Sequence, residues 1–238
     1  MQSRLLSITQ SNYIPWKGYF DMIHQVDEFV LFDDVQYTDR DWRNRNRIKT
    51  ASGSHWITIP IEKKNYRSKK INEIKVIYAQ RWTEKHWRSI EHNYSRSPYF
   101  KKYASCFQRI YESLEMDCPF LSQVNERFIT TISALLGIQT KISRSSDFEL
   151  IEGKSERLLA ICLQAKATHY LSGPAAKAYL DEDLFKRNGI KILWMDYSDY
   201  VEYPQLYPPF EHAVSILDLI FNTGPRACNF MKSFQKIT

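Results

Sequence analysis

The sequence predicts an α/β fold: a mostly parallel sheet with helices on both faces, together with a helical insertion. Short apolar runs alternate with segments of helical spacing at both ends of the chain. Between them, from about residue 82 to 137, the periodicity is helical only. We therefore expect one α/β domain from residues 1–80 and 138–238, with 81–137 as a helical insertion or subdomain.

The amino-terminal part of the chain is predicted to begin with a strand that is followed by a helix. RLLSITQ (4–10) is a short apolar run that ends in polar residues, which is typical of a buried strand. Residues 16–26 place apolar side chains at helical spacing. EFVLFDDV (28–35) predicts a second strand, and HWITIPIE (55–62) a third after the turn at 51–53.

The middle of the chain changes character. INEIKVI (71–77) predicts a fourth strand after the basic loop KKNYRSKK (63–70). The helical segment that follows is interrupted at Pro98 and Pro119, because a proline disfavours helical backbone at the residue before it.

Strands and helices then alternate again, as the return of short apolar runs indicates. The predicted elements are a strand at 140–146, a helix at 155–165, a strand at 168–173, a helix from about Ala175, a strand at 191–197, and a helix at 212–221 before Gly224-Pro225.

Composition narrows the class of protein. The net charge of +6 and the pI near 9.0 favour a partner with phosphate or carboxylate groups. The four cysteines form no C-x-x-C pair, which indicates reduced thiols. No stretch approaches the roughly 18 apolar residues of a membrane span, and the apolar start is too short for a signal peptide, so a cytoplasmic protein is expected.

Polar residues follow the predicted strands. Parallel strands end at one edge of a sheet, where ligands bind beside the point at which strand order reverses. We expect the following residues to converge on that rim: Gln10, Asp33, Asp34, Ser145, Ser146, Ser172, Gly173, Asp196 and Tyr197.

QSNYIPWKGYF (10–20) joins the first strand to the first helix, whose amino terminus suits an anion. Tyr13 and Trp16 are candidate stacking walls for a base or sugar, and Gly18 allows a close approach. The alternative is that the aromatic residues belong to the core. No Gly-rich phosphate loop occurs anywhere.

Asp33 and Asp34 are the candidate catalytic residues. Adjacent carboxylates can bind Mg²⁺, hold a ribose hydroxyl, or accept a proton from an amine. If both residues belonged to a strand, their side chains would point to opposite faces of the sheet. The alternative to a catalytic role is that they cap a helix or turn and form an ion pair with a nearby arginine.

WRNRNRIK (42–49) alternates with period two. If it is extended, Arg43, Arg45, Arg47 and Lys49 share one face suited to phosphate or carboxylate. The alternative, a solvated basic edge, applies best to Arg47 and Lys49. The loop 63–70 is interpreted mainly as a solvated face.

The histidines and cysteines predict no metal site, and no nucleophile motif of hydrolases is present.

The chain resembles the WbqC-like family of bacterial proteins, often encoded among genes for O-antigen and other surface polysaccharides. Four blocks carry the resemblance: QSNYIPWKGYF (10–20), FDDVQYTDRDWRNRNRIKT (32–50) with WITIPI (56–61), YLSGPAAKAYL (170–180) and YPPFEHAVSILDLIFNTGP (207–225). Ser11-Asn12 and Ala175-Ala176 depart from the family pattern.

The predicted substrate-binding residues within or beside these blocks are Gln10, Tyr13, Trp16, Gly18, Tyr19, Gln36, Arg43, Asn44, Arg45, Asn46, Ser172, Gly173 and Tyr179. The resemblance implies a role in polysaccharide biosynthesis. A weaker likeness to pantothenate synthetases and other nucleotidyltransferase-like, Rossmann-like enzymes supports the fold. Their H-x-G-H motif is replaced here by Trp16-Lys17-Gly18-Tyr19, which weighs against ordinary adenylyl transfer.

Two functions are expected from these features. The first is an enzyme that modifies a nucleotide-linked amino sugar by forming an amide with an acyl or amino-acid donor, with ATP and Mg²⁺ as candidate cofactors. The alternative is an accessory protein that binds a nucleotide-sugar or, with less support, tRNA. Either could form a homo-oligomer.

Overall fold

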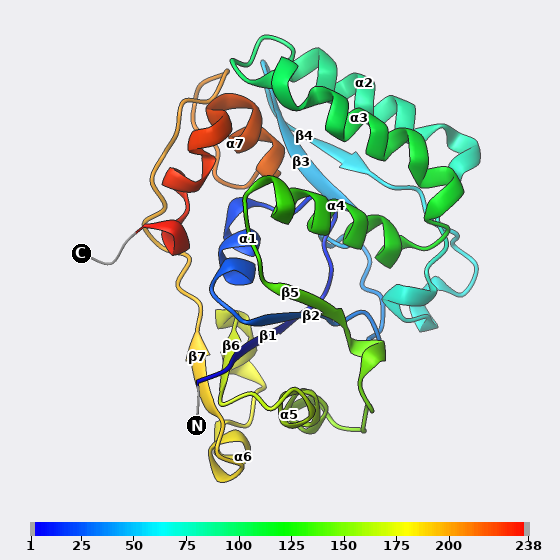
Figure 1. The fold of residues 1–238 in the computed structure, drawn as a ribbon. Helices are drawn as coiled ribbons and strands as arrows, with labels where there is room; N and C mark the ends of the chain where they lie inside the picture. The colour runs from blue at the N-terminus through cyan, green and yellow to red at the C-terminus, as the bar shows by residue number, and fades with distance from the viewer. Residues whose placement is uncertain (1–2, 236–238) are drawn as a thin grey trace.

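A five-stranded parallel sheet forms the centre of the molecule (Figure 1). The computed structural model describes residues 3–235. The strands are β1 (Leu5–Thr9), β2 (Glu28–Leu31), β5 (Lys141–Arg144), β6 (His169–Ser172) and β7 (Lys191–Trp194). They lie in the order β5-β2-β1-β6-β7, and all neighbouring pairs are parallel. The predicted fold class is confirmed.

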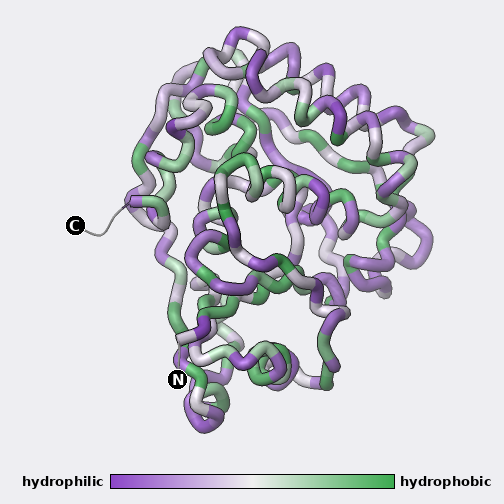
Figure 2. Tube along the Cα trace, viewed as in Figure 1, coloured by the Kyte–Doolittle hydropathy of each residue, from purple (hydrophilic) through white to green (hydrophobic). Residues whose placement is uncertain are grey.

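Helices cover both faces of this sheet. The helices of the molecule are α1 (Lys17–His24), α2 (Trp82–Tyr94), α3 (Phe100–Asp117), α4 (Leu121–Leu135), α5 (Lys154–Gln164), α6 (Glu182–Arg187) and α7 (Ile216–Thr223). Of these, α2 and α3 pack on each other beyond α4 and do not cover the sheet (Figure 1). Leu6, Ile8 and Val30 pack with α5 and α6 on one face. Phe29 and Leu31 face the other side, where they belong to one hydrophobic cluster with buried residues of α1 and α4. Hydrophobic residues accordingly concentrate between the layers in Figure 2.

The helical segment follows the predicted breaks. Helix α2 ends before Pro98, and α3 ends before Pro119. Its buried residues, such as Phe107 and Phe128, belong to the same hydrophobic cluster as Phe20 of α1. The division into 1–80 with 138–238 and 81–137 stays a prediction. No helix within residues 3–235 is long and apolar enough to cross a membrane.

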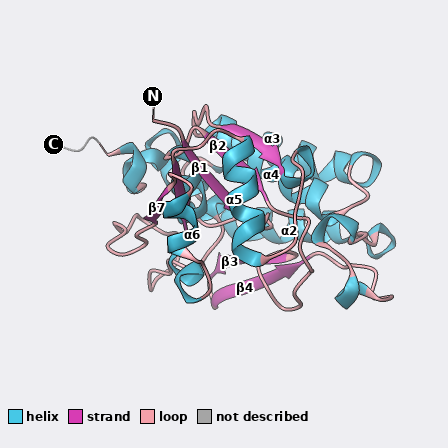
Figure 3. Ribbon diagram, turned by 90° about the horizontal axis from the view of Figure 1, so that it is seen from below, coloured by secondary structure: helices cyan, strands magenta, loops and turns pink. Residues whose placement is uncertain are grey.

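A hairpin lies apart from the main sheet. Strands β3 (Arg45–Thr50) and β4 (Gly53–Thr58) pair antiparallel, and Figure 3 shows them separated from the five-stranded sheet. The strand predicted at 55–62 therefore exists, but it joins a second sheet and ends two residues before Pro60.

Three predicted elements differ from the structure. Residues 71–77 form no strand: Ile71–Glu73 is a 3₁₀ turn, because Ile71 and Ile74 both enter the core at a spacing of three. The helix predicted from about Ala175 is a 3₁₀ turn, Pro174–Ala178, followed by α6. Helix α7 begins later than predicted, because the Ser215 side chain caps it by accepting from the Leu217 amide.

The strand order reverses between β1 and β6. From β1 the chain moves outward through β2 to β5, and it then returns through α5 to place β6 on the other side of β1. In open α/β sheets this reversal opens a crevice at the carboxyl ends of the two strands. Gln10 follows β1 there, and Ser172 ends β6.

Candidate functional site

A pocket of about 650 Å³ lies at this reversal, and we call it the switch-point pocket. Strand β1 and the residue after it contribute Ile8, Thr9 and Gln10, and β6 contributes Tyr170 and Ser172. The first turn of α5 closes another side. The pocket therefore occupies the place where such sheets bind ligands.

Three cations line the switch-point pocket, namely Arg43, Lys154 and Arg157, and none of its lining residues is acidic. Within residues 3–235, neither Lys154 nor Arg157 forms an ion pair. Arg157 Nε donates to the Ile151 carbonyl at 2.9 Å, which fixes the base of its guanidinium and leaves its other nitrogens for a ligand. This lining favours an anion that accepts several charged hydrogen bonds.

Helix α5 adds its amino terminus to the same wall. Gly153 precedes its first residue and has a φ of +97°, a conformation that L side chains rarely adopt. Lys154 and Arg157 lie in the first turn together with Glu156, whose carboxylate lies against Gly153. The turn therefore keeps one net positive charge, which adds to the positive end of the helix dipole.

Five predicted binding residues meet in this pocket, namely Gln10, Arg43, Ser172, Gly173 and Tyr179. Ser172 is buried, with 4% of its surface exposed. No atom lies within 4 Å of the position that a Gly173 side chain would take, so the backbone there is open to a ligand. Tyr179 is largely exposed and lies on the rim.

The loop that follows β1 is held in a strained conformation. Ile14 has a φ of +40°, which is unfavourable for a β-branched residue by about 1–3 kcal/mol. Asn46 Nδ2 donates to the Tyr13 carbonyl at 2.9 Å and to the Ile14 carbonyl at 2.7 Å. The Asn46 side chain therefore holds the backbone of this loop in place through these two hydrogen bonds.

Asp33 also supports this loop. It lies beyond the end of β2 at Leu31, and its Oδ1 accepts from the Ser11 amide at 2.9 Å. Burial raises the pKa of Asp33 to about 6, while hydrogen bonds from Ser11 and the charge of Arg43 partly offset this rise. Asp33 is thus a carboxyl group whose charge changes near neutral pH.

Asp34 is engaged by polar neighbours. Its Oδ2 accepts from Ser145 Oγ at 2.7 Å, and its Oδ1 accepts from Asn72 Nδ2 at 3.0 Å. Lys70 Nζ lies 3.7 Å from Oδ1. Both aspartates line a separate cavity of about 180 Å³ beside β5, and neither lines the switch-point pocket.

The structure does not bring the basic residues of 42–49 to one ligand. The guanidinium carbons of Arg45 and Arg47 lie 4.2 and 4.6 Å from the Trp56 ring centre, on one face of β3. Lys49 is buried and its Nζ donates to the Pro209 carbonyl. The interpretation of Lys49 as part of a solvated basic edge is therefore wrong. Only Arg43, which precedes the strand, lines the switch-point pocket.

An aromatic pocket of about 320 Å³ lies close by. Trp16 and Trp42 line it together with Asn12, Asn46 and His212. Arg43 Nη1 donates to Asn12 Oδ1, so this pair joins the aromatic pocket to the switch-point pocket.

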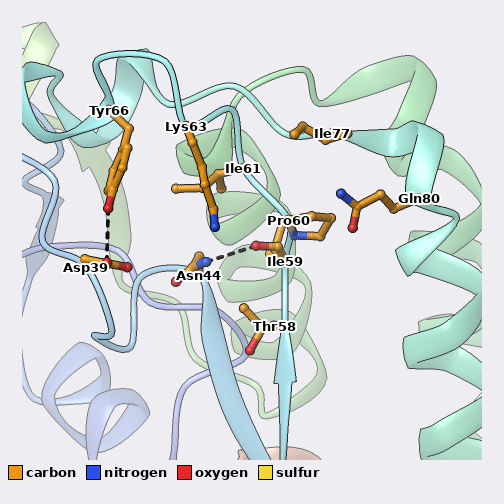
Figure 4. Close-up of a pocket in the computed structure, with 10 residues that line it drawn as sticks. All are labelled: Asp39, Asn44, Thr58, Ile59, Pro60, Ile61, Lys63, Tyr66, Ile77 and Gln80. Carbon is orange, nitrogen blue, oxygen red and sulfur yellow. Dashed lines mark hydrogen bonds between the residues drawn. The ribbon is translucent and has the colours of Figure 1, made fainter.

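Asn44 lines a third pocket, of about 640 Å³, beside the hairpin (Figure 4). Asn44 Nδ2 donates to the Ile59 carbonyl at 2.9 Å, and Tyr66 donates to Asp39 Oδ2 at 3.1 Å. Figure 4 shows Lys63 extending its amine toward Asn44. Arg43 and Asn44 therefore serve different pockets.

The other predicted binding residues lie outside all these pockets. Tyr13 is fully buried, with its oxygen 2.9 Å from His86 Nδ1 and 2.5 Å from Tyr111 Oη. Gly18 lies under the Trp16 ring, where a Cβ would approach it to 2.3 Å. Tyr19 donates to the Gln10 carbonyl at 3.1 Å, and exposed Gln36 donates to the Arg67 carbonyl.

Sequence reasoning missed Lys154, Arg157 and His212. One signal for Lys154 and Arg157 was available in the sequence. Gly153-Lys154 begins the helix predicted after the strand at 140–146, and the connection from a strand to the next helix lies at the carboxyl end of the strand, where ligands bind. No group of three metal-ligating side chains clusters within residues 3–235.

Comparisons with known proteins give one family and one relative. The model of the WbqC-like protein family matches residues 10–230. A protein of Mycobacterium tuberculosis (strain ATCC 25618 / H37Rv), named uncharacterized protein Rv1507c, is 48% identical over 227 residues, which cover 95% of this chain and 97% of the relative. No solved structure matches the chain.

Proposed function

The chain belongs to the WbqC-like protein family, and from this premise we propose that it is an enzyme acting on a nucleotide-linked amino sugar. The proposed reaction forms an amide between the sugar amine and an acyl or amino-acid donor, in the assembly of a bacterial surface polysaccharide. One observation carries the proposal: the switch-point pocket has three cations and no carboxylate at the sheet edge where α/β proteins bind nucleotides.

The diphosphate of the substrate is the group that this lining fits best. Arg157 can bind phosphate oxygens through its two terminal nitrogens, which have no partner among residues 3–235. Lys154 and Arg43 add positive charge, and Arg43 is held in place by Asn12 and by Asp41, whose Oδ2 lies 3.4 Å from its Nη2. Ser172 and the open backbone at Gly173 supply neutral polar contacts. Phe32 and Tyr179 offer apolar surface for the nucleoside.

In the proposed reaction the amine nitrogen attacks the carbonyl carbon of an activated carboxyl group. The activated carboxyl group is an acyl phosphate, formed from the carboxylate and ATP with release of ADP. A C–N bond forms, the bond from the carbonyl carbon to the phosphate oxygen breaks so that phosphate leaves, and the proton of the amine passes to water. Nearby cations favour the neutral, nucleophilic form of the amine and stabilise the negative charge that develops on the carbonyl oxygen. Arg43, which lies between the switch-point pocket and the aromatic pocket, is the cation suited to both effects.

ATP is the proposed source of carboxyl activation. Its phosphates compete with the diphosphate of the sugar substrate for the same cations, so activation of the carboxyl group precedes binding of the nucleotide-linked sugar. None of the residues that line the switch-point pocket is a carboxylate that could hold the accompanying Mg²⁺. We therefore propose no protein-bound magnesium in this pocket.

We assign Asp33 a positioning role. A proton acceptor must lie within hydrogen-bond reach of its substrate, and Asp33 lines the neighbouring cavity instead. Through Ser11 it holds the loop that carries Asn12, the partner of Arg43.

Mass spectrometry tests the proposed reaction. Purified protein is incubated with ATP, glycine and a dTDP-linked 4-amino sugar, and an amide of the expected mass is sought. Arg157→Ala should lose the product, whereas Arg109→Ala, which removes the same charge from an exposed position on α3, should retain it. Absence of any product, together with equal nucleotide binding by Arg157→Ala, would contradict the proposal.

The alternative, an accessory protein that binds tRNA, is supported by the exposed basic residues Lys63, Lys64 and Arg67 beside Tyr66. Retention of tRNA that disappears at high salt, without any amide product, would favour it.

A further inference from the structure

The aromatic pocket has a chemical character distinct from that of the switch-point pocket. Two indoles, Trp16 and Trp42, line a space of about 320 Å³ in which His212 is the only ionisable lining residue. A pocket of this kind suits an uncharged ring more than a phosphate.

Both indoles are held in place by other aromatic rings. Trp16 packs on Tyr197 and Tyr200, with ring centres 5.3 and 5.5 Å apart. Trp42 packs on Trp56 at 5.1 Å. The walls of the aromatic pocket are therefore built by packing that does not depend on a ligand.

The wall between the two pockets is thin. Trp42 and Arg43 are consecutive residues, and they line the aromatic and the switch-point pocket respectively. Gln10 lines the switch-point pocket and Asn12 the aromatic one, two residues along the same strained loop. The Arg43–Asn12 hydrogen bond spans this wall, so a phosphate bound by Arg43 lies next to the aromatic pocket.

Asn12 also provides a polar contact. Its Oδ1 is engaged by Arg43, and within residues 3–235 its amide nitrogen makes no hydrogen bond. A donor beside two apolar ring faces fits a sugar, which presents C–H groups on its faces and hydroxyls on its rim.

We propose that the aromatic pocket binds the sugar ring of the nucleotide-linked substrate, with Trp42 and Trp16 contacting its faces and Asn12 donating to a hydroxyl. This inference rests on the proposed function, because it places the diphosphate in the switch-point pocket. It makes Trp42 a residue that determines which sugar is accepted. The nucleoside lies on the opposite side of the diphosphate, towards Tyr179.

Calorimetric titrations with dTDP and with dTDP-glucose test this assignment. In the unchanged protein, the sugar should improve affinity by about threefold to tenfold for each ring that it contacts. Trp42→Ala should lower this gain by about threefold to tenfold, leaving the part due to Trp16, and should leave the affinity for dTDP itself unchanged, which also shows that the variant is folded. Tyr179→Ala should weaken both nucleotides equally and preserve the gain.

Other results overturn the inference in distinguishable ways. If dTDP binds but the sugar gives no gain, or the gain is undiminished in Trp42→Ala, the sugar lies elsewhere while the proposed function stands. If Trp42→Ala weakens dTDP and dTDP-glucose by the same factor, the aromatic pocket holds the base. If neither nucleotide binds the unchanged protein, the proposed function fails and this inference fails with it.

Discussion

Replacing Asp33 by asparagine removes a carboxyl group that is buried behind the loop following β1. The side chain is 6% exposed, and its Oδ1 accepts from the Ser11 amide at 2.9 Å. An asparagine oxygen can accept the same hydrogen bond, so the change removes the titration of this site while keeping its shape.

The expected effect follows from the raised pKa. Burial moves the pKa of Asp33 from its usual 3.8 to about 6, so between these values the folded state binds more protons than the unfolded state. The contribution of Asp33 to the free energy of unfolding is therefore present at low pH and is lost as the pH rises through about 6. Its size is about 3 kcal/mol, from 1.36 kcal/mol per pH unit.

Urea unfolding at several pH values between 4 and 7 measures this effect. The stability of Asp33→Asn relative to the unchanged protein should rise by about 2.5 kcal/mol across this range and then level off, because the remaining part of the full change falls below pH 4. Asp183→Asn controls for changing a carboxyl to an amide at an exposed position on α6. If the curves for Asp33→Asn and the unchanged protein run parallel, Asp33 is not desolvated as the structure indicates.

The remaining predictions concern the strained loop, the start of α5 and the basic strand. Asn46→Ala should lower the free energy of unfolding by about 2–4 kcal/mol in urea titrations, because two buried carbonyls lose their hydrogen-bond donor. Asn44→Ala loses one such hydrogen bond and should lower the free energy of unfolding by about half as much. Equal losses in the two variants would contradict the role of Asn46. Gly153→Ala should destabilise the protein by about 1–2 kcal/mol, because alanine is strained at a φ of +97°, and an unchanged melting temperature would show that this backbone conformation is not required. Arg45→Ala should change the dissociation constant of dTDP by no more than about twofold in calorimetry, because Arg45 stacks on Trp56 outside the switch-point pocket. A tenfold loss of affinity would show that Arg45 contacts the nucleotide.

The sequence predicted the sheet well, because each buried strand is a short apolar run between polar turns. It failed at residues 71–77, where Ile71, Ile74 and Val76 resemble a strand but pack as a 3₁₀ turn and an isolated bridge. Such a segment follows its tertiary contacts rather than its own periodicity.

The candidate site was predicted only in part. Gln10, Ser172 and Gly173 were found because the carboxyl ends of strands are recognisable in sequence. The separation of Arg43 from Arg45 was not, since it depends on where β3 begins and on Trp56 from β4. Gly153-Lys154 marks the start of a helix in the sequence, but the sequence does not show that α5 crosses back beside β1 and β6, which is what brings Lys154 and Arg157 into the site.

Calorimetric titration of dTDP tests the central claim, that the switch-point pocket binds the diphosphate of a nucleotide. Lys154→Ala combined with Arg157→Ala should weaken binding about tenfold or more, because charged hydrogen bonds to phosphate are lost. Lys101→Ala combined with Arg109→Ala removes the same charge from exposed positions on α3 and should bind dTDP as the unchanged protein does. Equal affinities for all three proteins, or equal losses in both double variants, would contradict the claim.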